Sequence, residues 1–421
     1  MKILFILFLI FLFSSTSRAE VSQDDWNKTV SPLLKRNLWK KETAYDSSHY
    51  LMVPLHAAFW LEKKEWIEDF HDFFRRFVNN TDQLPGGLTG RLNRLQYLFF
   101  ASRYLVLAQE STPNQLIEIL LSEVRTFWME EPAWQWRCNP YPGGIKERLS
   151  WKLSEKNVEP SYLRAVVDEE LFLIGIAANV QTFLRKNKIS SPLYVDEILA
   201  MAKKIFVDEI SWNDSGGWIL QPGVWTDHPD YVFAGNSVVS DDIRKKPVLK
   251  ISWDSSHSHR LPLILFSLSG SVDCGTDDFY FYKKLTEGLQ KQFFEKVLVP
   301  PDENFKFYRT KNYMDGSNGI YRYSYNSEIK GFAYSAFALS GTPLIGWWAF
   351  LFDFRIPEIY KNYISNIEPM LIWLKDIDPY GQKSWIFREH YQAITPVNLH
   401  FSMQINDMRE RFLKKRRVSC L

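Results

Sequence analysis

Apolar residues recur at helical spacing through most of this chain, and this periodicity most restricts the folds open to it. In segment 161–184, the apolar residues that share one broad face are Leu163, Val166, Val167, Leu171, Ile174, Ala178 and Leu184. Such spacing is typical of an amphipathic α-helix, whereas a half-buried strand would alternate apolar and polar residues. The sequence therefore predicts a predominantly all-α fold.

The same pattern predicts further helices at 54–78, 92–108, 114–128, 192–210, 262–268, 277–297, 331–339, 343–354, 357–375 and 400–417. One short hairpin is expected between 305–309 and 319–325. Two long connections, 130–151 and 212–253, hold many tryptophans and tyrosines. Such residues are rare in disordered chains, so we expect both connections to be ordered surface loops.

One short pattern occurs twice in the chain. Residues 45–49 read Tyr-Asp-Ser-Ser-His and residues 253–257 read Trp-Asp-Ser-Ser-His, and Pro-Leu follows each, at 54–55 and 262–263. A repeat indicates a duplicated unit, here a helix with the loop before it, because Asp and Ser cap helices and Pro suits a first turn. We therefore expect an (α/α) toroid of about six helical hairpins, with a less regular helical solenoid as the alternative.

The first 19 residues have the features of a secretory signal peptide. Lys2 precedes an apolar run at 3–13, and Ser17 and Ala19 occupy the −3 and −1 positions of a cleavage site. We expect cleavage after Ala19, export to the periplasm or the medium, and a single domain over residues 20–421. An uncleaved membrane anchor is the alternative. No second stretch approaches membrane-spanning length, so no integral membrane segment is expected after cleavage.

Charge and motif content exclude several classes of function. Lys plus Arg number 51 and Asp plus Glu number 49, so a nucleic-acid partner is not expected. The sequence contains no phosphate-binding loop, dinucleotide-binding glycine motif, nucleophile elbow or zincin motif, and we expect no cofactor. Three cysteines allow at most one disulfide, for which Cys138 and Cys274 are the pair to test.

The densest group of reactive side chains comprises Asp254, His257, His259 and Arg260. Imidazole titrates near neutral pH and suits a general base, and a guanidinium suits a carboxylate ligand. The alternative is that this segment only caps a helix, as the related segment 45–49 indicates. Two histidines two positions apart do not share a helix face, so no metal ion is expected there.

The aromatic loops supply candidate substrate contacts. Trp134 and Trp136 are expected to stack on sugar rings, Glu147 to act as an acid and Arg148 to hold an anion. The alternative is that the tryptophans fill the core and Glu147 stabilises the start of a helix.

The second loop supplies further contacts. In this loop Trp225, Asp227 and His228 have the same character as the candidates of the first loop. Tyr323 belongs to a tyrosine cluster and is the expected acid partner for a histidine base. These residues complete the set of candidates for substrate binding and catalysis.

Aromatic residues make up 16% of this helical chain. At the level of architecture it resembles the (α/α)-toroid carbohydrate-active enzymes, namely polysaccharide lyases and inverting glycoside hydrolases. The resemblance implies a polysaccharide or oligosaccharide substrate. We prefer β-elimination on a uronate-containing glycan, in which Arg260 neutralises the carboxylate and His257 or His259 takes the proton. One alternative is an inverting hydrolase, for which Glu147, Asp254 and Asp315 are the candidate carboxyl groups. The other is a non-catalytic glycan-binding or cell-envelope assembly protein.

Overall fold

Helices dominate the computed structural model, which describes residues 20–135, 138–324 and 331–415, without the side chains of Glu110, Cys138 and Asn139. Fifteen α-helices lie in these residues, and their strands form three antiparallel pairs. The prediction of a predominantly helical chain is therefore confirmed. The predicted signal peptide, residues 1–19, lies outside the described part.

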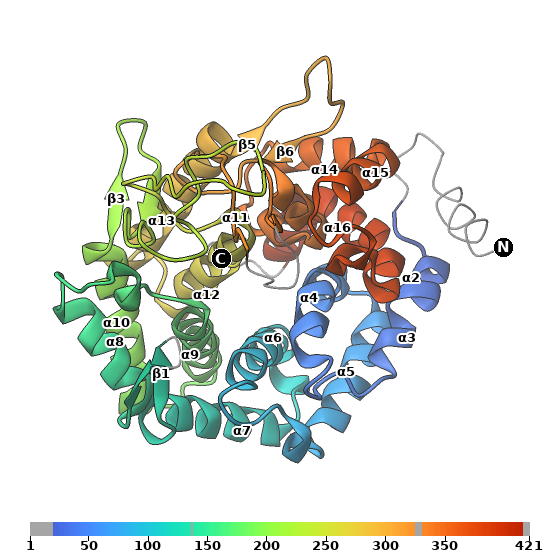
Figure 1. Cartoon of the computed structure of the whole chain (residues 1–421). Coiled ribbons are helices and arrows are strands. Elements are labelled where there is room, and N and C mark those ends of the chain that lie inside the picture. The colour runs from blue at the N-terminus through green and yellow to red at the C-terminus, as the bar shows by residue number, and fades with distance from the viewer. Residues whose placement is uncertain (1–19, 136–137, 325–330, 416–421) are drawn as a thin grey trace.

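An inner layer of helices surrounds the middle of the molecule in Figure 1. It comprises α4 (Ala44–Trp60), α6 (Arg91–Ala108), α9 (Asp168–Lys186), α12 (Leu261–Ser271) and α16 (Glu389–Lys415). Helix α16 packs on α4, α4 on α6, α6 on α9, and α9 on α12. Most residues of α4, α6, α9 and α12 are buried, as expected for helices that have neighbours on several sides.

The inner helices run parallel to one another. The ion pairs that join their N-terminal ends are Arg91–Glu169, Asp168–Arg260 and Asp46–Arg388. At the opposite ends, Arg185 donates to the Gly270 carbonyl, and Lys415 pairs with Glu62. Since the N-terminal end of a helix carries partial positive charge, the positive helix ends gather on one face.

Outer helices cover this layer in Figure 1. They are α5 (Lys64–Val78), α7 (Asn114–Arg125), α10 (Leu193–Asp208), α13 (Asp277–Gln292) and α14 (Ile356–Ser365). Helix α5 is amphipathic, and its buried residues are Trp66, Phe70, Phe73, Phe74 and Phe77. This pattern is typical of a helix with one face on the core and one in solvent.

Shorter elements connect the helices. The remaining helices are α2 (Gln23–Thr29), α3 (Ser31–Leu34), α8 (Gly144–Ser154), α11 (Ser255–Ser258) and α15 (Ile367–Ile377). The strand pairs are β1 (Ala133–Gln135) with β2 (Cys138–Tyr141), β3 (Ile210–Trp212) with β4 (Trp218–Leu220), and β5 (Leu298–Val299) with β6 (Arg309–Thr310). Two 3₁₀ segments, η7 (Ala338–Ile345) and η8 (Trp347–Leu351), complete the core, and η8 packs on both α12 and α16.

Several predicted boundaries are wrong. Segment 54–78 is two helices, because Glu62 adopts a left-handed backbone with φ of 52° and ends the first of them. No glycine or proline marks that break in the sequence. Segment 357–375 likewise divides into α14 and α15, and residues 331–337 are not helical.

The predicted hairpin is also wrong. Strand β6 pairs with β5, and Tyr321 forms an isolated bridge with Tyr334 instead of pairing with 305–309. A second isolated bridge joins Asp254 to Tyr313. Segment 309–324 is therefore tied to elements distant in the sequence, which local alternation does not reveal.

The buried apolar side chains form one cluster that extends from Val21 to Met408. Among the residues with described structure, no helix combines the length and the apolar character that crossing a bilayer requires.

Candidate active site

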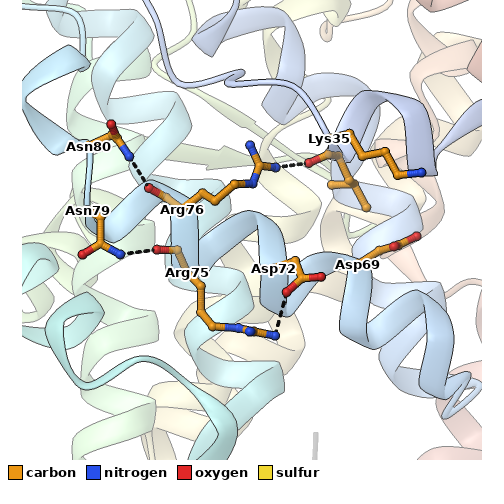
Figure 2. Close-up of a pocket in the computed structure, with 8 residues that line it drawn as sticks. Lys35, Asp69, Asp72, Arg75, Arg76, Asn79 and Asn80 are labelled. Carbon is orange, nitrogen blue, oxygen red and sulfur yellow. Dashed lines mark hydrogen bonds and ion pairs between the residues drawn. The ribbon is translucent and has the colours of Figure 1, made fainter.

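A groove of about 510 Å³ lies between α3 and α5, on the outer side of the molecule (Figure 2). Most of its charged side chains have partners within the protein. Arg75 pairs with Asp72 at 2.7 Å, and Asp69 accepts a hydrogen bond from the Trp26 indole. Since none of the predicted catalytic residues lines it, this groove is not the candidate active site.

Asp254 begins the more reactive cluster, as the N-cap of α11. One of its oxygens accepts hydrogen bonds from the backbone N–H groups of Ser256 and His257, both at 3.1 Å. This confirms the predicted cap, and Pro262 lies in the first turn of α12 as expected. The first copy of the pattern differs, because Asp46 and Pro54 lie inside α4.

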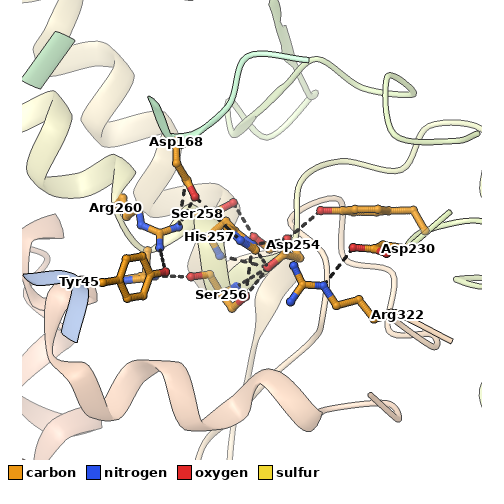
Figure 3. A network of polar contacts seen from close by, with 11 residues as sticks. Tyr45, Asp168, Asp230, Asp254, Ser256, His257, Ser258, Arg260 and Arg322 are labelled. Atoms are coloured by element: carbon orange, nitrogen blue, oxygen red, sulfur yellow. Dashed lines mark hydrogen bonds and ion pairs between the residues drawn. The ribbon is translucent and has the colours of Figure 1, made fainter. Parts of the chain in front are cut away.

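The same carboxylate orients the His257 imidazole (Figure 3). His257 Nδ1 lies 2.7 Å from Asp254 Oδ2, which also accepts a hydrogen bond from the Tyr231 hydroxyl at 2.7 Å. An ionised carboxylate only accepts hydrogen bonds, so Nδ1 carries the proton and Nε2 of the neutral ring keeps its lone pair. The His257 side chain is 24% exposed and therefore reachable from solvent.

Burial alone would raise the pKa of Asp254, which has no exposed surface. The charge of His257, together with hydrogen bonds from His257, Ser256 and Tyr231, outweighs burial and holds that pKa well below its usual range. Asp254 is therefore ionised at neutral pH and fixes the orientation of the His257 ring by accepting a hydrogen bond from Nδ1.

Arg260, Asp168 and Tyr45 complete one side of the cluster. Arg260 Nη1 donates to both oxygens of Asp168, at 3.0 and 3.1 Å, and Nη2 donates to the Tyr45 hydroxyl at 2.7 Å. Asp168 Oδ2 lies 3.9 Å from His257 Nε2. Three separate segments, α4, the start of α9 and the loop before α12, thus meet at the dyad of Asp254 and His257. The sequence analysis missed Tyr45 and Asp168, although Tyr45 begins the first copy of the repeated pattern.

Arg322 and Asp230 approach from the other side (Figure 3). Arg322 Nε donates to Asp230 Oδ2 at 3.0 Å, and the backbone N–H of Arg322 donates to the Asp230 carbonyl at 2.9 Å. Arg322 has a left-handed backbone, with φ of 57°. Non-glycine residues in that conformation are costly and gather at functional sites. Its side chain is 27% exposed.

His259 does not join this cluster. It is 1% exposed, its Nδ1 donates to the Ser256 carbonyl, and its ring packs on Trp347 and His49. Burial, with the nearby charge of Arg260, lowers the pKa of His259 well below its ordinary value. Of the predicted segment, the structure therefore brings Asp254, His257 and Arg260 together, but leaves His259 in the core.

Glu147 and Arg148, the charged candidates of the first aromatic region, lie on α8 and have partners of their own. Glu147 accepts a hydrogen bond from the Gly143 N–H at 2.7 Å and stabilises the start of α8. Arg148 is buried and pairs with Glu169 and Glu170, both at 2.8 Å. Glu147 thus has the structural role given above as its alternative, and Arg148 joins α8 to the start of α9.

Trp134 and Trp136 belong to the same loop. Trp134 is partly exposed, and its carbonyl accepts a hydrogen bond from Arg148. Trp136 lies outside the described residues. Sugar stacking by these two tryptophans stays a prediction.

The second aromatic loop packs behind the dyad. Trp225 is buried and stacks between Tyr231 and Trp253, and Trp253 stacks on His257 in turn, with ring centroids 5.6 Å apart. This arrangement supports the imidazole from behind, so Trp225 has no open face for a sugar.

The other candidates of that region connect loops. Asp227 accepts hydrogen bonds from the N–H and hydroxyl of Ser161, and His228 is buried. The Tyr323 hydroxyl donates to the carbonyls of Ser240 and Asp241, at 3.0 and 2.5 Å. The Tyr323 hydroxyl is thus committed to the loop at 240–241, whereas the Tyr45 hydroxyl bonds Arg260 beside the dyad.

No group of three or more His, Cys, Asp or Glu side chains in the described ranges is arranged to hold a metal ion. Comparisons with family models, with curated proteins and with solved structures found no match for this chain. The function of this chain is therefore inferred from the geometry of the cluster around His257.

Proposed function

We propose that this chain is an exported polysaccharide lyase with an (α/α)-toroid fold, which cleaves a uronate-containing glycan by β-elimination. The toroid part of this proposal is supported by the arrangement of the helices, in which outer helices cover parallel inner ones. The observation that carries the reaction is the dyad of Asp254 and His257, with a phenol and two guanidinium groups beside it.

His257 is the general base. Its Nε2 removes the proton from the carbon next to the uronate carboxylate, and that electron pair forms the carbon–carbon double bond as the glycosidic oxygen leaves. Asp254 stabilises the resulting imidazolium. A positioned base of this kind contributes about 10²- to 10⁴-fold to a rate.

Tyr45 is the acid that protonates the leaving oxygen. Its hydroxyl accepts a hydrogen bond from Arg260, so its own proton remains available to donate. Burial raises the pKa of Tyr45 and keeps the phenol protonated at neutral pH, although Arg260 opposes this effect. Tyr45 replaces Tyr323 in the role expected from the sequence.

Arg322 binds the uronate carboxylate in this proposal. Arg260 is buried and already paired with both oxygens of Asp168, so its role is to orient Tyr45. Arg322 is the more exposed of the two and lies on the opposite side of the dyad. Neutralising the carboxylate lowers the cost of the negative charge that develops when the proton leaves.

An inverting hydrolase is the second candidate, because the Asp168 carboxylate lies 3.9 Å from His257 Nε2. Inversion requires two carboxyl groups with room for a water molecule between them and the sugar. In that case Asp168 or Asp230, and not Glu147, would act together with Asp254.

The test uses residues 20–421 with uronate-rich and neutral polysaccharides. Ultraviolet absorbance reports unsaturated products, and reducing ends report any cleavage. We expect absorbance on uronate polymers, a loss of about 10²- to 10⁴-fold in kcat for His257→Ala, and a similar loss for Asp254→Asn. His71→Ala, a partly buried histidine on α5, is the matched control. Reducing ends without absorbance would establish a hydrolase instead, and glycan binding without cleavage would establish a binding protein.

A further inference from the structure

A second charged cluster adjoins Tyr45 on the same face. Asp46, the next residue of α4, accepts hydrogen bonds from Arg388 Nη1 at 2.6 Å and from the Tyr391 hydroxyl at 3.1 Å. Burial alone would raise the pKa of Asp46, but His390, Arg388 and Tyr391 together lower it. Asp46 is therefore ionised at neutral pH and fixes the position of the Arg388 guanidinium.

Arg388 remains open to solvent despite this ion pair. Its side chain is 52% exposed, and Asp46 is the one acidic partner the described contacts give it. Arg388 directly precedes α16, a helix of 27 residues, whose N-terminal end adds partial positive charge. An arginine held by one carboxylate retains N–H groups for a second, because the guanidinium has five donors.

An aromatic surface lies beside this arginine. Trp385 is partly exposed, and its ring meets that of Tyr391 edge to face, with centroids 4.8 Å apart. Tyr391 also bonds Asp46, so Trp385 and Arg388 are held by the same support. A tryptophan face beside a guanidinium is the combination that an acidic sugar requires, with apolar C–H contact on one side and charge on the other.

The second cluster is continuous with the dyad. The Tyr45 ring contacts the His49 ring, and the His49 imidazole lies within 3.5 Å of the Tyr391 hydroxyl. Tyr45 and Asp46 are consecutive residues, so their Cα atoms are about 3.8 Å apart. A polymer of several sugar units bound at Tyr45 is therefore long enough to extend to Arg388.

We infer that Trp385 and Arg388 form a second subsite for an acidic sugar, so the substrate carries negative charge on more than one unit. This inference rests on the proposed function, because that function places an acidic sugar at the dyad of Asp254 and His257. It goes beyond that function because it assigns a charge pattern to the polymer and a binding role to a region outside the reacting centre.

The test measures binding apart from catalysis. The His257→Ala protein is titrated calorimetrically with uronate oligosaccharides of two and of six units, with and without Arg388→Ala. We expect Arg388→Ala to weaken hexamer binding about tenfold or more and dimer binding much less, with partial recovery in Arg388→Lys. Arg75→Ala is the matched control, because Arg75 is 56% exposed and ion-paired on the outer helix α5.

In the active protein, Arg388→Ala is expected to raise KM for the polymer and leave kcat within about twofold, as loss of uniform binding does. Hexamer binding that is unchanged in Arg388→Ala, or weakened equally in Arg75→Ala, would overturn the subsite. Elimination by the parent protein with unchanged binding in Arg388→Ala would reject the subsite and keep the proposed lyase. A length-dependent loss with no elimination by the parent protein would support the subsite and reject the lyase.

Discussion

His257 and His259 are two positions apart and have opposite environments. His257 is partly exposed and bonded to a carboxylate, whereas His259 is buried and bonded to the Ser256 carbonyl. Side chains two positions apart in a helical turn point in different directions, so one faces solvent when the other faces the core. From the sequence alone, the segment was a candidate site, and either histidine was a candidate for the general base.

Buried histidines make the stability of this protein sensitive to mild acid. Burial, with the nearby Arg260 or Arg103, lowers the pKa values of His49, His56 and His259 well below 6.5. The unfolded chain therefore binds more protons than the folded one just below pH 6.5, and the free energy of unfolding falls as the pH decreases. We expect a loss of about 1.4 kcal/mol per pH unit for each such histidine.

Urea unfolding at pH 7.5, 6.5 and 5.5 measures this dependence. His259→Asn keeps a donor for the Ser256 carbonyl and cannot titrate, so it should reduce the slope between pH 6.5 and 5.5 by up to about 1.4 kcal/mol per pH unit. A free energy of unfolding that stays constant over this range would contradict the prediction.

At the level of elements, the start of α9 concentrates three acidic residues with different partners. Asp168 pairs with Arg260 at the candidate site. Glu169 pairs with Arg91 of α6 and Arg148 of α8, and Glu170 pairs with Arg148 and Lys152. Acidic residues suit a helix N-terminus, and here they also join α9 to its neighbours. The sequence predicted this helix from residue 161, but α9 begins at Asp168. The four basic partners were not predicted either, because they come from other elements.

Glu170 is the most consequential of these residues for stability. Its side chain is fully buried, and it accepts hydrogen bonds from Arg148 at 2.8 Å and Lys152 at 2.6 Å. Without the negative charge of Glu170, the buried cations of Arg148 and Lys152 lose part of the charge that stabilises them. We expect Glu170→Gln to lower the free energy of unfolding by about 3 to 5 kcal/mol, measured by urea unfolding.

Glu68→Gln, on the exposed Glu68–Arg75 pair, is the control and should cost about 1 kcal/mol or less. Equal losses in the two variants would show that burial of the pair does not set its contribution.

At the level of the whole molecule, the parallel inner helices place their N-terminal ends on the face that carries His257, Arg322 and Arg388. Partial positive charge from those ends adds to the arginines, and together they favour an anionic polymer over a neutral one. The acidic residues of the cluster keep the arginines in position. This arrangement supports the uronate preference of the proposed lyase more strongly than any single ion pair.

The same parallel arrangement bears on the disulfide. Cys274 is disulfide-bonded and follows the C-terminal end of α12. Cys138 begins β2, whose partner β1 contacts Arg148 and thereby the N-terminal end of α9. Helix α9 has 19 residues and spans about 28 Å, which separates the two cysteines by far more than the 4.4–6.8 Å between bonded Cα atoms.

We therefore expect Cys274 to pair with Cys420, which lies outside the described residues, and not with Cys138, the pair proposed from the sequence. In the sequence Cys420 follows Phe412 by eight residues, and Phe412 lines a small cavity together with Gly270 at the end of α12. Peptide mapping without reduction should yield a Cys274–Cys420 peptide, and Cys138→Ser should leave it intact. A Cys138–Cys274 peptide would contradict the arrangement of helix ends described above.

The sequence by itself determined the helical class, the cap at Asp254 and the segment that holds the proposed base. These features depend on residues a few positions apart, through helical periodicity and hydrogen bonds within one turn. Only the tertiary structure decided that Tyr45, Asp168 and Arg322 join this segment and that His259 leaves it. Arg260 contacts Tyr45 across 215 residues and Asp168 across 92. Contacts at such separations arise from the packing of inner helices, and local patterns contain no record of which helices will be neighbours.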